Sequence, residues 1–388
     1  MTEKVYNEKI LSRSINPAAH EMLARAEELG LETAWDRYEA QIPQCGFGEL
    51  GVCCRNCNMG PCRISPFEEE GPKLGVCGAT ADIIVARNLI RMIAAGAAAH
   101  SDHGRDIAHT LLLTAEGKGG GYEIKDEGKL KTLASEYGIE VDSRSKEEIA
   151  LDLARAVYSE FGKQEGPIQF TRRAPEKRVA LWKSLGIDPR GIDREIVEIM
   201  HRTHIGVDND PVNLILQGLR ASISDGWGGS MVATELSDVL FGTPTPVRSV
   251  SNLGVLKEDY VNIVLHGHEP TLSEMIVTAA QDPEMLALAK KYGTQGINVV
   301  GMCCTGNEIL MRHGVPIAGN FLDQELAVIT GAVDAIIVDV QCIFPALGAL
   351  TGCFHTKFIS PPRPRLSSQA RCTSSFTRNR HTTSPKRL

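Results

Sequence analysis

The chain has 388 residues, 43% of them hydrophobic and 23% charged, a composition typical of a globular protein rather than of a disordered or fibrous one. The first ten residues are polar and lack the apolar run of a secretory signal peptide. The longest weakly polar stretch, 90–99, contains Arg91 and is too short to span a bilayer. We therefore expect a cytoplasmic protein with no transmembrane segment.

Charge is unevenly distributed along the chain. Residues 360–388 contain six Arg, one Lys and no acidic residue, so they carry +7 and the rest carries −14 within a net charge of −7. An acidic body argues against a nucleic-acid-binding surface. The basic stretch has the composition of a disordered tail. Because the change is abrupt, a frameshifted end of the gene is the explanation we favour over a natural tail.

The pattern predicts an α/β multidomain protein. Residues 1–80 should hold an N-terminal helix and a loop-rich segment, and 81–240 should be mainly helical. One long helix is expected over 80–115, with Gly96 or Gly104 as the place where it would break. In 241–359, three β-branched runs alternate with helical stretches, which predicts a Rossmann-like parallel sheet. These runs are 260–266, 297–304 and 334–342.

Six of the eleven cysteines fall within residues 45–77. In a reducing compartment such a group more often binds metal than forms disulfides. A [4Fe–4S] cubane needs four thiolates, and one compact set of four is Cys54, Cys57, Cys62 and Cys77. Cys45 and Cys53 then remain, and two such pairs from two chains would complete a second cubane on a two-fold axis. This count predicts a homodimer that shares one cluster.

Zinc is the alternative metal for these cysteines. Zinc ribbons usually have paired C-x2-C knuckles, and only Cys54 and Cys57 have that spacing here. Six reduced cysteines without any metal are a further alternative, and the spacing favours iron–sulfur clusters over both.

Further metal-competent side chains end the three predicted strands. His268 follows the first strand, Cys303 and Cys304 end the second, and Cys342 ends the third. Taken singly, each is more often an ordinary histidine or a small buried thiol. Functional groups gather outside the carboxyl ends of parallel strands, however. Their convergence predicts a second metal centre, of a type with one unusual iron site.

Three histidines lie close together in AAAHSDHGRDIAHT, namely His100, His103 and His109. On a helix the first two are neighbours at i, i+3, but all three would share one face only if the helix were kinked. Histidine relays protons near neutral pH. Spare histidines on a solvated helix are the alternative.

Five stretches together resemble the catalytic subunit of anaerobic nickel–iron carbon monoxide dehydrogenases. They are CGFGELGVCCRNCNMGPCRI with GVCG, AAAHSDHGRDIAHT, VLHGHEPTLSE, INVVGMCCTGNE and VDVQC, and the resemblance extends over residues 1–359. It implies an oxidoreductase that converts CO and water to CO2, two protons and two electrons. It also implies a homodimer that passes electrons to ferredoxin or a similar acceptor, with an acetyl-CoA synthase subunit as a further candidate partner.

The resemblance also assigns roles to individual residues. Cys45 and Cys53 match ligands of the inter-subunit [4Fe–4S] cluster, and the compact set of four matches the relay [4Fe–4S] cluster of each subunit. His268, Cys304 and Cys342 match ligands of the active-site Ni-4Fe-4S cluster, and Cys303 matches a position beside it. His100 matches the acid–base histidine. His103 and His109 match the proton-exit row, in which Asp106 stands where another histidine is common.

Members of this family continue well beyond the point where this chain ends, and that region holds three more cysteine ligands of the nickel cluster and a lysine. Only Cys353 and Cys372 follow Cys342 here. We therefore expect a truncated or frameshifted chain with an incomplete nickel-cluster ligand set. The rival predictions are a hybrid-cluster protein that reduces hydroxylamine, a non-catalytic iron–sulfur electron-transfer fragment and a zinc-binding interaction module.

Overall fold

The structure is a computed structural model that describes residues 6–360. Two compact units make up the described chain: residues 6–42 together with 244–360, and residues 43–243. The helices of 6–42 thus belong to the same unit as the sheet. The predicted domain limits at 80 and 240 stay predictions, and the predicted tail lies, apart from Ser360, outside the described residues.

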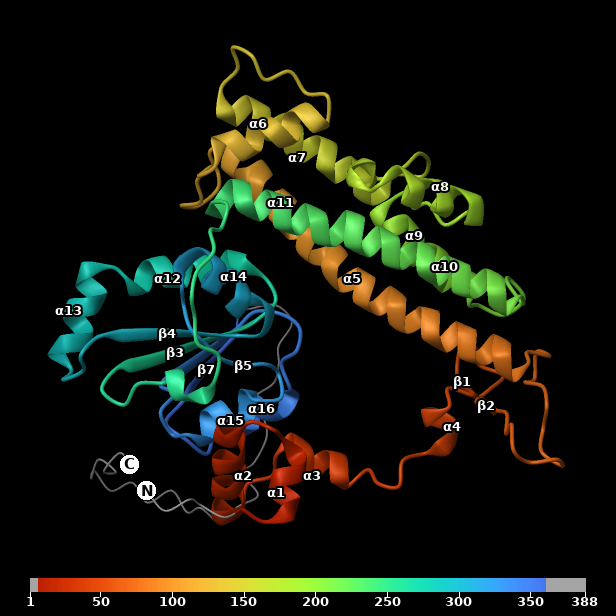
Figure 1. Cartoon of the computed structure of the whole chain (residues 1–388), viewed down its shortest axis with the longest axis horizontal. Helices are drawn as coiled ribbons and strands as arrows, with labels where there is room; N and C mark the ends of the chain where they lie inside the picture. Colours follow the sequence, from red (N-terminus) through yellow and green to blue (C-terminus); the bar gives the residue numbers. More distant parts are fainter. Residues whose placement is uncertain (1–5, 361–388) are drawn as a thin grey trace. The chain divides into compact units, whose positions relative to one another are not determined.

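A five-stranded parallel sheet organises the first unit (Figure 1). Its strands are β3 (Val261–Gly267), β4 (Ile297–Met302), β5 (Ile317–Gly319), β6 (Ala335–Val338) and β7 (Lys357–Ile359). Their order is β5-β4-β3-β6-β7, with the first strand in the middle, as in a Rossmann fold. The three predicted runs form β4, β3 and β6, which confirms the predicted α/β class. The prediction of a wholly helical stretch between β4 and β6 was wrong, because β5 pairs with β4 there.

Successive side chains along a strand point to opposite faces of the sheet, and here both faces carry apolar residues. Helices therefore cover both faces. Leu265 packs with α12 (Pro270–Ala280) and α14 (Cys303–His313) on one face. Val264, Val300 and Ile336 pack on the other face with α2 (Pro17–Leu29), α15 (Gln324–Ile329) and α16 (Pro345–Thr351). The other elements of this unit are α1 (Glu8–Arg13), α3 (Ala34–Glu39), η3 (Leu253–Val255) and α13 (Pro283–Lys291).

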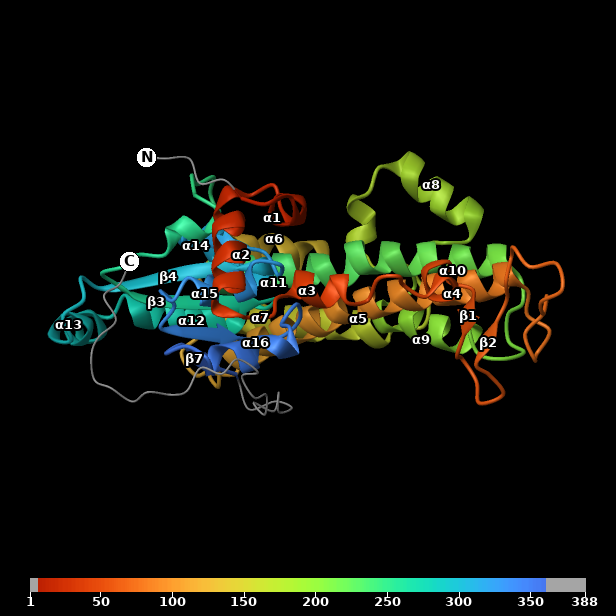
Figure 2. The same cartoon turned by 90° about the horizontal axis from the view of Figure 1, so that it is seen from below.

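The second unit is built around one long helix, α5 (Ala81–Ala115). Thr80 caps its first turn by accepting a hydrogen bond from the Ile83 N–H. The helix is continuous, so it does not break at Gly96 or Gly104. It packs against α7 (Lys146–Gly162), α9 (Ile192–Arg202), α10 (Pro211–Ser224) and α11 (Ser230–Phe241). It runs beside α10 in both Figure 1 and Figure 2. By length and composition α5 is the one helix within residues 6–360 that could cross a membrane, a test that core helices also pass.

A second long helical stretch lies along α5 and contains a π-helical turn. It comprises α10 (Pro211–Ser224), the π turn η2 (Asp225–Gly229) and α11 (Ser230–Phe241). Such turns are rare and often mark functional sites. The remaining elements of this unit are α4 (Gly46–Glu49), β1 (Cys53–Cys54), β2 (Cys62–Arg63), α6 (Glu127–Glu136), α7 (Lys146–Gly162), η1 (Gln169–Arg173), α8 (Glu176–Leu185) and α9 (Ile192–Arg202).

Glycines allow α5 and the π turn to approach at backbone distance. A Cβ atom added at Gly229 would lie 2.8 Å from the carbonyl carbon of His100, and one added at Gly104 would lie 2.8 Å from the Gly229 oxygen. These contacts are with backbone, which cannot move aside as a flexible side chain can.

We therefore expect Gly229→Ala to lower the free energy of unfolding by about 1–3 kcal/mol, the usual cost of overpacking. Gly96→Ala is the control on α5, the helix that Gly229 contacts, since nothing lies within 4 Å of its added Cβ. That change should raise stability by about 0.5–1 kcal/mol through helix propensity. Denaturant unfolding of both variants measures the difference, and equal effects would contradict the close approach.

Candidate metal centres

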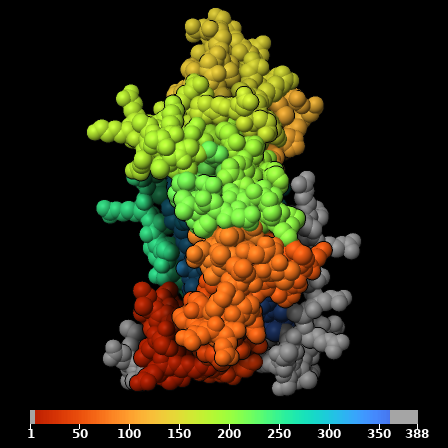
Figure 3. Space-filling model, turned by 90° about the vertical axis from the view of Figure 1, so that its right-hand side faces the viewer, coloured from red at the N-terminus to blue at the C-terminus, as the bar shows by residue number. Residues whose placement is uncertain are grey.

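The cysteine-rich segment of the second unit is held by very little regular structure. The strands β1 and β2 pair antiparallel, which sets Cys54 opposite Cys62. Asn88 of α5 donates hydrogen bonds to the carbonyl oxygens of Gly51 and Cys53, at 2.8 and 2.9 Å. The segment is thus fastened to the first turns of α5, and Figure 3 shows the orange part of the chain that contains it open to view.

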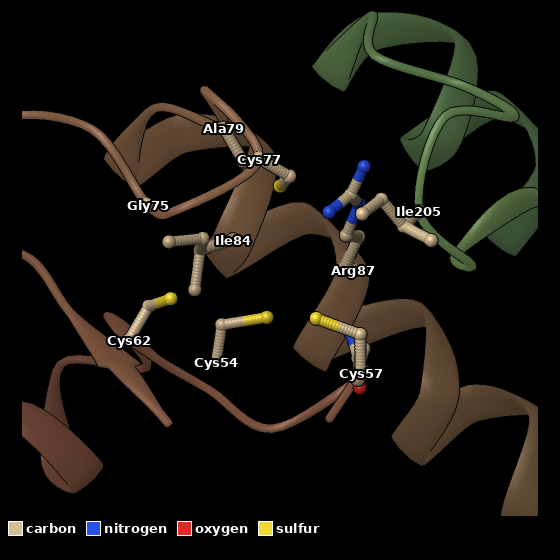
Figure 4. A pocket seen from close by; sticks show the side chains of 10 residues that line it. Cys54, Cys57, Cys62, Gly75, Cys77, Ala79, Ile84, Arg87 and Ile205 are labelled. Carbon is tan, nitrogen blue, oxygen red and sulfur yellow. The ribbon is translucent and has the colours of Figure 1, made fainter. Parts of the chain in front are cut away.

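Four of the predicted ligands surround one small pocket. Its lining includes Cys54, Cys57, Cys62 and Cys77. Figure 4 shows their sulfur atoms turned toward a common space. Gly60 lets the chain pass close to Cys62, because a Cβ there would lie 3.0 Å from the Cys62 nitrogen. The backbone N–H of Val76 donates to the Cys62 Sγ at 3.4 Å, a bond of the kind that stabilises cluster sulfur.

Arg87 of α5 reaches the same pocket and is only 1% exposed. A backbone hydrogen bond from Ala79 and the Arg87 guanidinium together hold the pKa of the Cys77 thiol below its ordinary value. A lowered pKa favours the thiolate, which is the form that binds metal. The donor set and the buried cation therefore fit a polynuclear iron–sulfur cluster.

Residues 6–360 contain no group of three or more His, Cys, Asp or Glu side chains arranged to hold a single metal ion. A lone zinc ion would draw its thiolates to about 2.3 Å from one point. The four sulfurs in Figure 4 instead line the rim of a space.

Cys45 and Cys53 do not line this pocket. Cys45 is exposed at the start of α4, and Cys53 lies half-buried in β1. Of the six cysteines, the structure thus brings four around one pocket and leaves Cys45 and Cys53 outside it.

In the first unit, the second group of predicted ligands follows three adjacent strands. His268, 6% exposed, comes directly after β3. Cys303 and Cys304 begin α14 rather than ending a strand, and Cys303 bridges to Gly267 beside the carboxyl end of β3. Cys342 follows β6. Because β4, β3 and β6 are neighbours, these residues share one edge of the sheet.

Backbone conformation at this edge is unusual. Cys303, Gln341 and Cys342 all have left-handed φ angles, at 59°, 65° and 59°. Non-glycine residues seldom adopt such angles outside turns and functional sites. Two of the three are cysteines of the predicted centre.

The thiols at the sheet edge influence one another. Burial and the neighbouring Cys342 and Cys304 raise the pKa of Cys303 to about 12. Burial, Cys342 and Asp339 raise the pKa of Cys304. Burial also raises the pKa of Asp339 to about 7, against hydrogen bonds from neighbouring backbone amides. Acidic groups crowded in this way ionise together only when a cation compensates them.

Two residues that the sequence analysis did not single out hold this edge together. Asp339 accepts hydrogen bonds from the backbone N–H groups of His268 and Glu269, at 2.6 and 3.0 Å. Gly267 has a φ of 145°, and a Cβ there would overlap the Asp339 carboxylate. Buried Gln324 donates to the Cys342 carbonyl oxygen at 3.0 Å. The acidic residue in VDVQC was a usable signal for Asp339, whereas Gln324 had none.

The three histidines of α5 differ in their surroundings. His100 is half-buried, and its Nδ1 lies 2.7 Å from Oδ1 of Asp225 in the π turn. The Asp225 carboxylate raises the pKa of His100 through this hydrogen bond. His103 is buried, and exposed His109 makes an edge contact with the Tyr158 ring. No local sequence signal pointed to Asp225, which lies 125 residues from its partner.

Known proteins resemble this chain closely. Residues 52–364 match the Prismane/CO dehydrogenase family. Carbon monoxide dehydrogenase 1 of Methanosarcina mazei is 70% identical over 348 residues, which make up 90% of this chain and 55% of the relative. Carbon monoxide dehydrogenase/acetyl-CoA synthase subunit beta of Moorella thermoacetica is 46% identical over 360 residues, 92% of this chain and 53% of the relative.

A solved structure gives the same result. The crystal structure of Ni-free carbon monoxide dehydrogenase from Thermococcus sp. AM4 aligns with a TM-score of 0.90 at 56% sequence identity, over 96% of this chain and 59% of that chain. The chain spans about half the length of the curated relatives it matches. With a family match over most of its length, this chain belongs to the Prismane/CO dehydrogenase family.

Proposed function

We propose that this chain holds the electron-relay clusters, and part of the active centre, of an anaerobic enzyme that oxidises CO with water to CO2, two protons and two electrons. The observation that carries the proposal is the single pocket lined by Cys54, Cys57, Cys62 and Cys77. Four thiolates around one space are the ligand set of a [4Fe–4S] cluster. We infer the reaction, CO oxidation, from membership of the family and from the name of the Methanosarcina mazei relative.

The active centre would lie at the carboxyl edge of the parallel sheet. His268, Cys304 and Cys342 would be its protein ligands there, with Cys303 beside them. When bound, a nickel–iron–sulfur cluster would supply the Lewis acidity and redox chemistry of CO oxidation. Burial and acidic neighbours raise the pKa of both Cys303 and Cys304, and this crowding supports a bound cation. Asp339 holds the backbone of His268, and Gln324 holds that of Cys342.

Proton movement would begin at His100. Asp225 accepts from Nδ1 of the protonated ring and so favours the protonated form. His103 lies one turn further along α5, and His109 is exposed to solvent. Such a series, running from a half-buried acid–base group to the surface, suits release of protons to water.

Association with a second copy would complete the shared cluster of Cys45 and Cys53. Beside the loop of these cysteines, α5 carries an exposed apolar stripe at helical spacing, formed by Val85, Leu89 and Met92. A stripe of this kind suits burial in a homodimer.

For the remaining partners, the Moorella relative's name supports an acetyl-CoA synthase subunit as one candidate. We infer ferredoxin or a similar protein as the electron acceptor, and a cytoplasmic location.

Metal content tests the cluster assignment. Each chain would hold four irons in the relay cluster and share four with its partner, so Cys54→Ser should remove about two thirds of the iron in these two kinds of cluster and Cys45→Ser about one third. Cys303→Ser is the control and should leave both these clusters intact. Iron and sulfide analysis of anaerobically loaded protein measures this. Zinc in place of iron, or colourless protein, would contradict the assignment.

The reaction is tested by assaying viologen reduction with CO in protein loaded anaerobically with iron, sulfide and nickel. Whatever CO-dependent reduction this chain supports, Cys342→Ser should lower it about 100-fold or more, because a ligand of the active cluster is lost. Turnover of hydroxylamine instead would favour a hybrid-cluster protein. Intact iron–sulfur clusters with no turnover would favour the electron-transfer fragment.

Asp225→Asn tests the pairing with His100. A histidine whose folded pKa is raised contributes stability below its unfolded pKa, about 6.5, and loses that contribution as pH rises through the folded value. The variant should therefore be less stable than the wild type at about pH 5.5 and equally stable at about pH 8.5. The difference should stay below about 1 kcal/mol, since both side chains are partly exposed.

Asp102→Asn provides the control for this experiment. Asp102 is an exposed acid of α5 that pairs with Arg105 and not with a histidine. Its removal should change stability by an amount that does not depend on pH in this range. Denaturant unfolding at the two pH values is the measurement, and a pH-independent effect of Asp225→Asn would contradict the pairing.

A further inference from the structure

Arg87 is a buried cation without a carboxylate partner in the part of the chain that the structure describes. It is 1% exposed, and its Nη2 donates to the Asn209 Oδ1 at 3.0 Å and to the Asp208 carbonyl at 3.4 Å. Both acceptors are uncharged. Its Nε is buried and has no hydrogen-bond partner within residues 6–360. Burying a charge in this way is costly unless an opposite charge lies close by.

A second buried donor lines the same pocket. The Nδ2 of Asn56, a residue between two of the cysteines, is also buried and has no partner among the described residues. Both groups can only donate hydrogen bonds. Two buried donors without acceptors therefore border a pocket whose other polar groups are thiols.

The pocket offers one kind of acceptor that would satisfy both donors. Figure 4 shows the Arg87 guanidinium beside the side chain of Cys77, on the same side of the pocket as Ile205. Thiolate and sulfide sulfurs accept N–H hydrogen bonds and carry the negative charge that a buried arginine lacks.

We propose that Arg87 is the counter-charge of the cluster held by Cys54, Cys57, Cys62 and Cys77, and that it sets the reduction potential of that cluster. The proposal rests on the proposed function, because it requires iron–sulfur in this pocket. Reduction adds one electron to the cluster and breaks no bond. A fixed positive charge beside the cluster favours the state with the extra electron.

A purely structural role is the competing explanation, because Arg87 also ties the 208–209 loop to α5. Charge and shape can be separated by substitution. Arg87→Lys keeps the charge but loses the planar fork, whereas Arg87→Met keeps much of the apolar stem and loses the charge. Arg91→Met removes a positive charge one turn along α5, where Arg91 donates to the Thr203 hydroxyl.

The experiment is a redox titration with dithionite of the full chain carrying Cys45→Ser, so that one cluster is followed by its EPR signal. Arg87→Met should disfavour reduction at least tenfold, which lowers the midpoint potential by about 59 mV for one electron. Arg87→Lys and Arg91→Met should each change the equilibrium less than about threefold, roughly half of that energy. An unchanged midpoint in Arg87→Met would overturn the proposal.

Iron content covers the case in which a variant does not assemble its cluster. Loss of iron in Arg87→Met with retention in Arg87→Lys supports a need for charge. Loss in both argues for shape and against the proposal. Absence of iron from the protein that carries Cys45→Ser alone would contradict the proposed function itself, and it would do so before any Arg87 variant is compared.

Discussion

Negative charge gathered in a small, partly closed space is the constraint on which the rest of this structure depends. Around the first pocket, four thiols face one space, and the protein supplies a buried arginine and backbone N–H groups to them. At the sheet edge, burial and neighbouring acidic groups raise the pKa of Cys303 and of Cys304, and burial raises the pKa of Asp339. In a low-dielectric setting such groups are stable as anions only beside a cation. In the first pocket, Arg87 would supply part of this positive charge. At the sheet edge, bound metal would supply it.

Backbone geometry rather than side-chain packing fixes the sheet-edge site. Parallel pairing aligns the ends of β4, β3 and β6, so the residues that follow them converge. Beyond the strands, buried and partly buried side chains fix the path of the chain through hydrogen bonds to its backbone. Asp339 binds the amides after β3, and Gln324 binds the carbonyl of Cys342. Because Gln324 is buried and Asp339 is partly buried, these anchors can maintain the left-handed residues at the edge in spite of their intrinsic cost.

Much of this arrangement could be predicted from the sequence, because the signals are local. β-branched runs identified β3, β4 and β6, and cysteine spacing identified the set of four that lines one pocket. The short strand β5 has too few residues to interrupt the apolar pattern of the flanking helices. Arg87 could not be recognised, since an arginine in an amphipathic helix is usually solvated. Asp225 and Gln324 acquire their roles only through contacts that tertiary folding creates.

The pairing of His100 with Asp225 depends on a chain of local choices in the second unit. The π turn interrupts what would otherwise be one α-helix from Pro211 to Phe241. Without that turn, the residues that follow it would be rotated about the helix axis by roughly 100° from where they now lie. The π turn sets Asp225 and Gly229 against α5 together, and the backbone contact at Gly229 leaves little freedom in how the two helices approach. The same glycines that bring the helices together thus hold the carboxylate 2.7 Å from the imidazole. Helix packing in this unit is therefore inseparable from the protonation of His100.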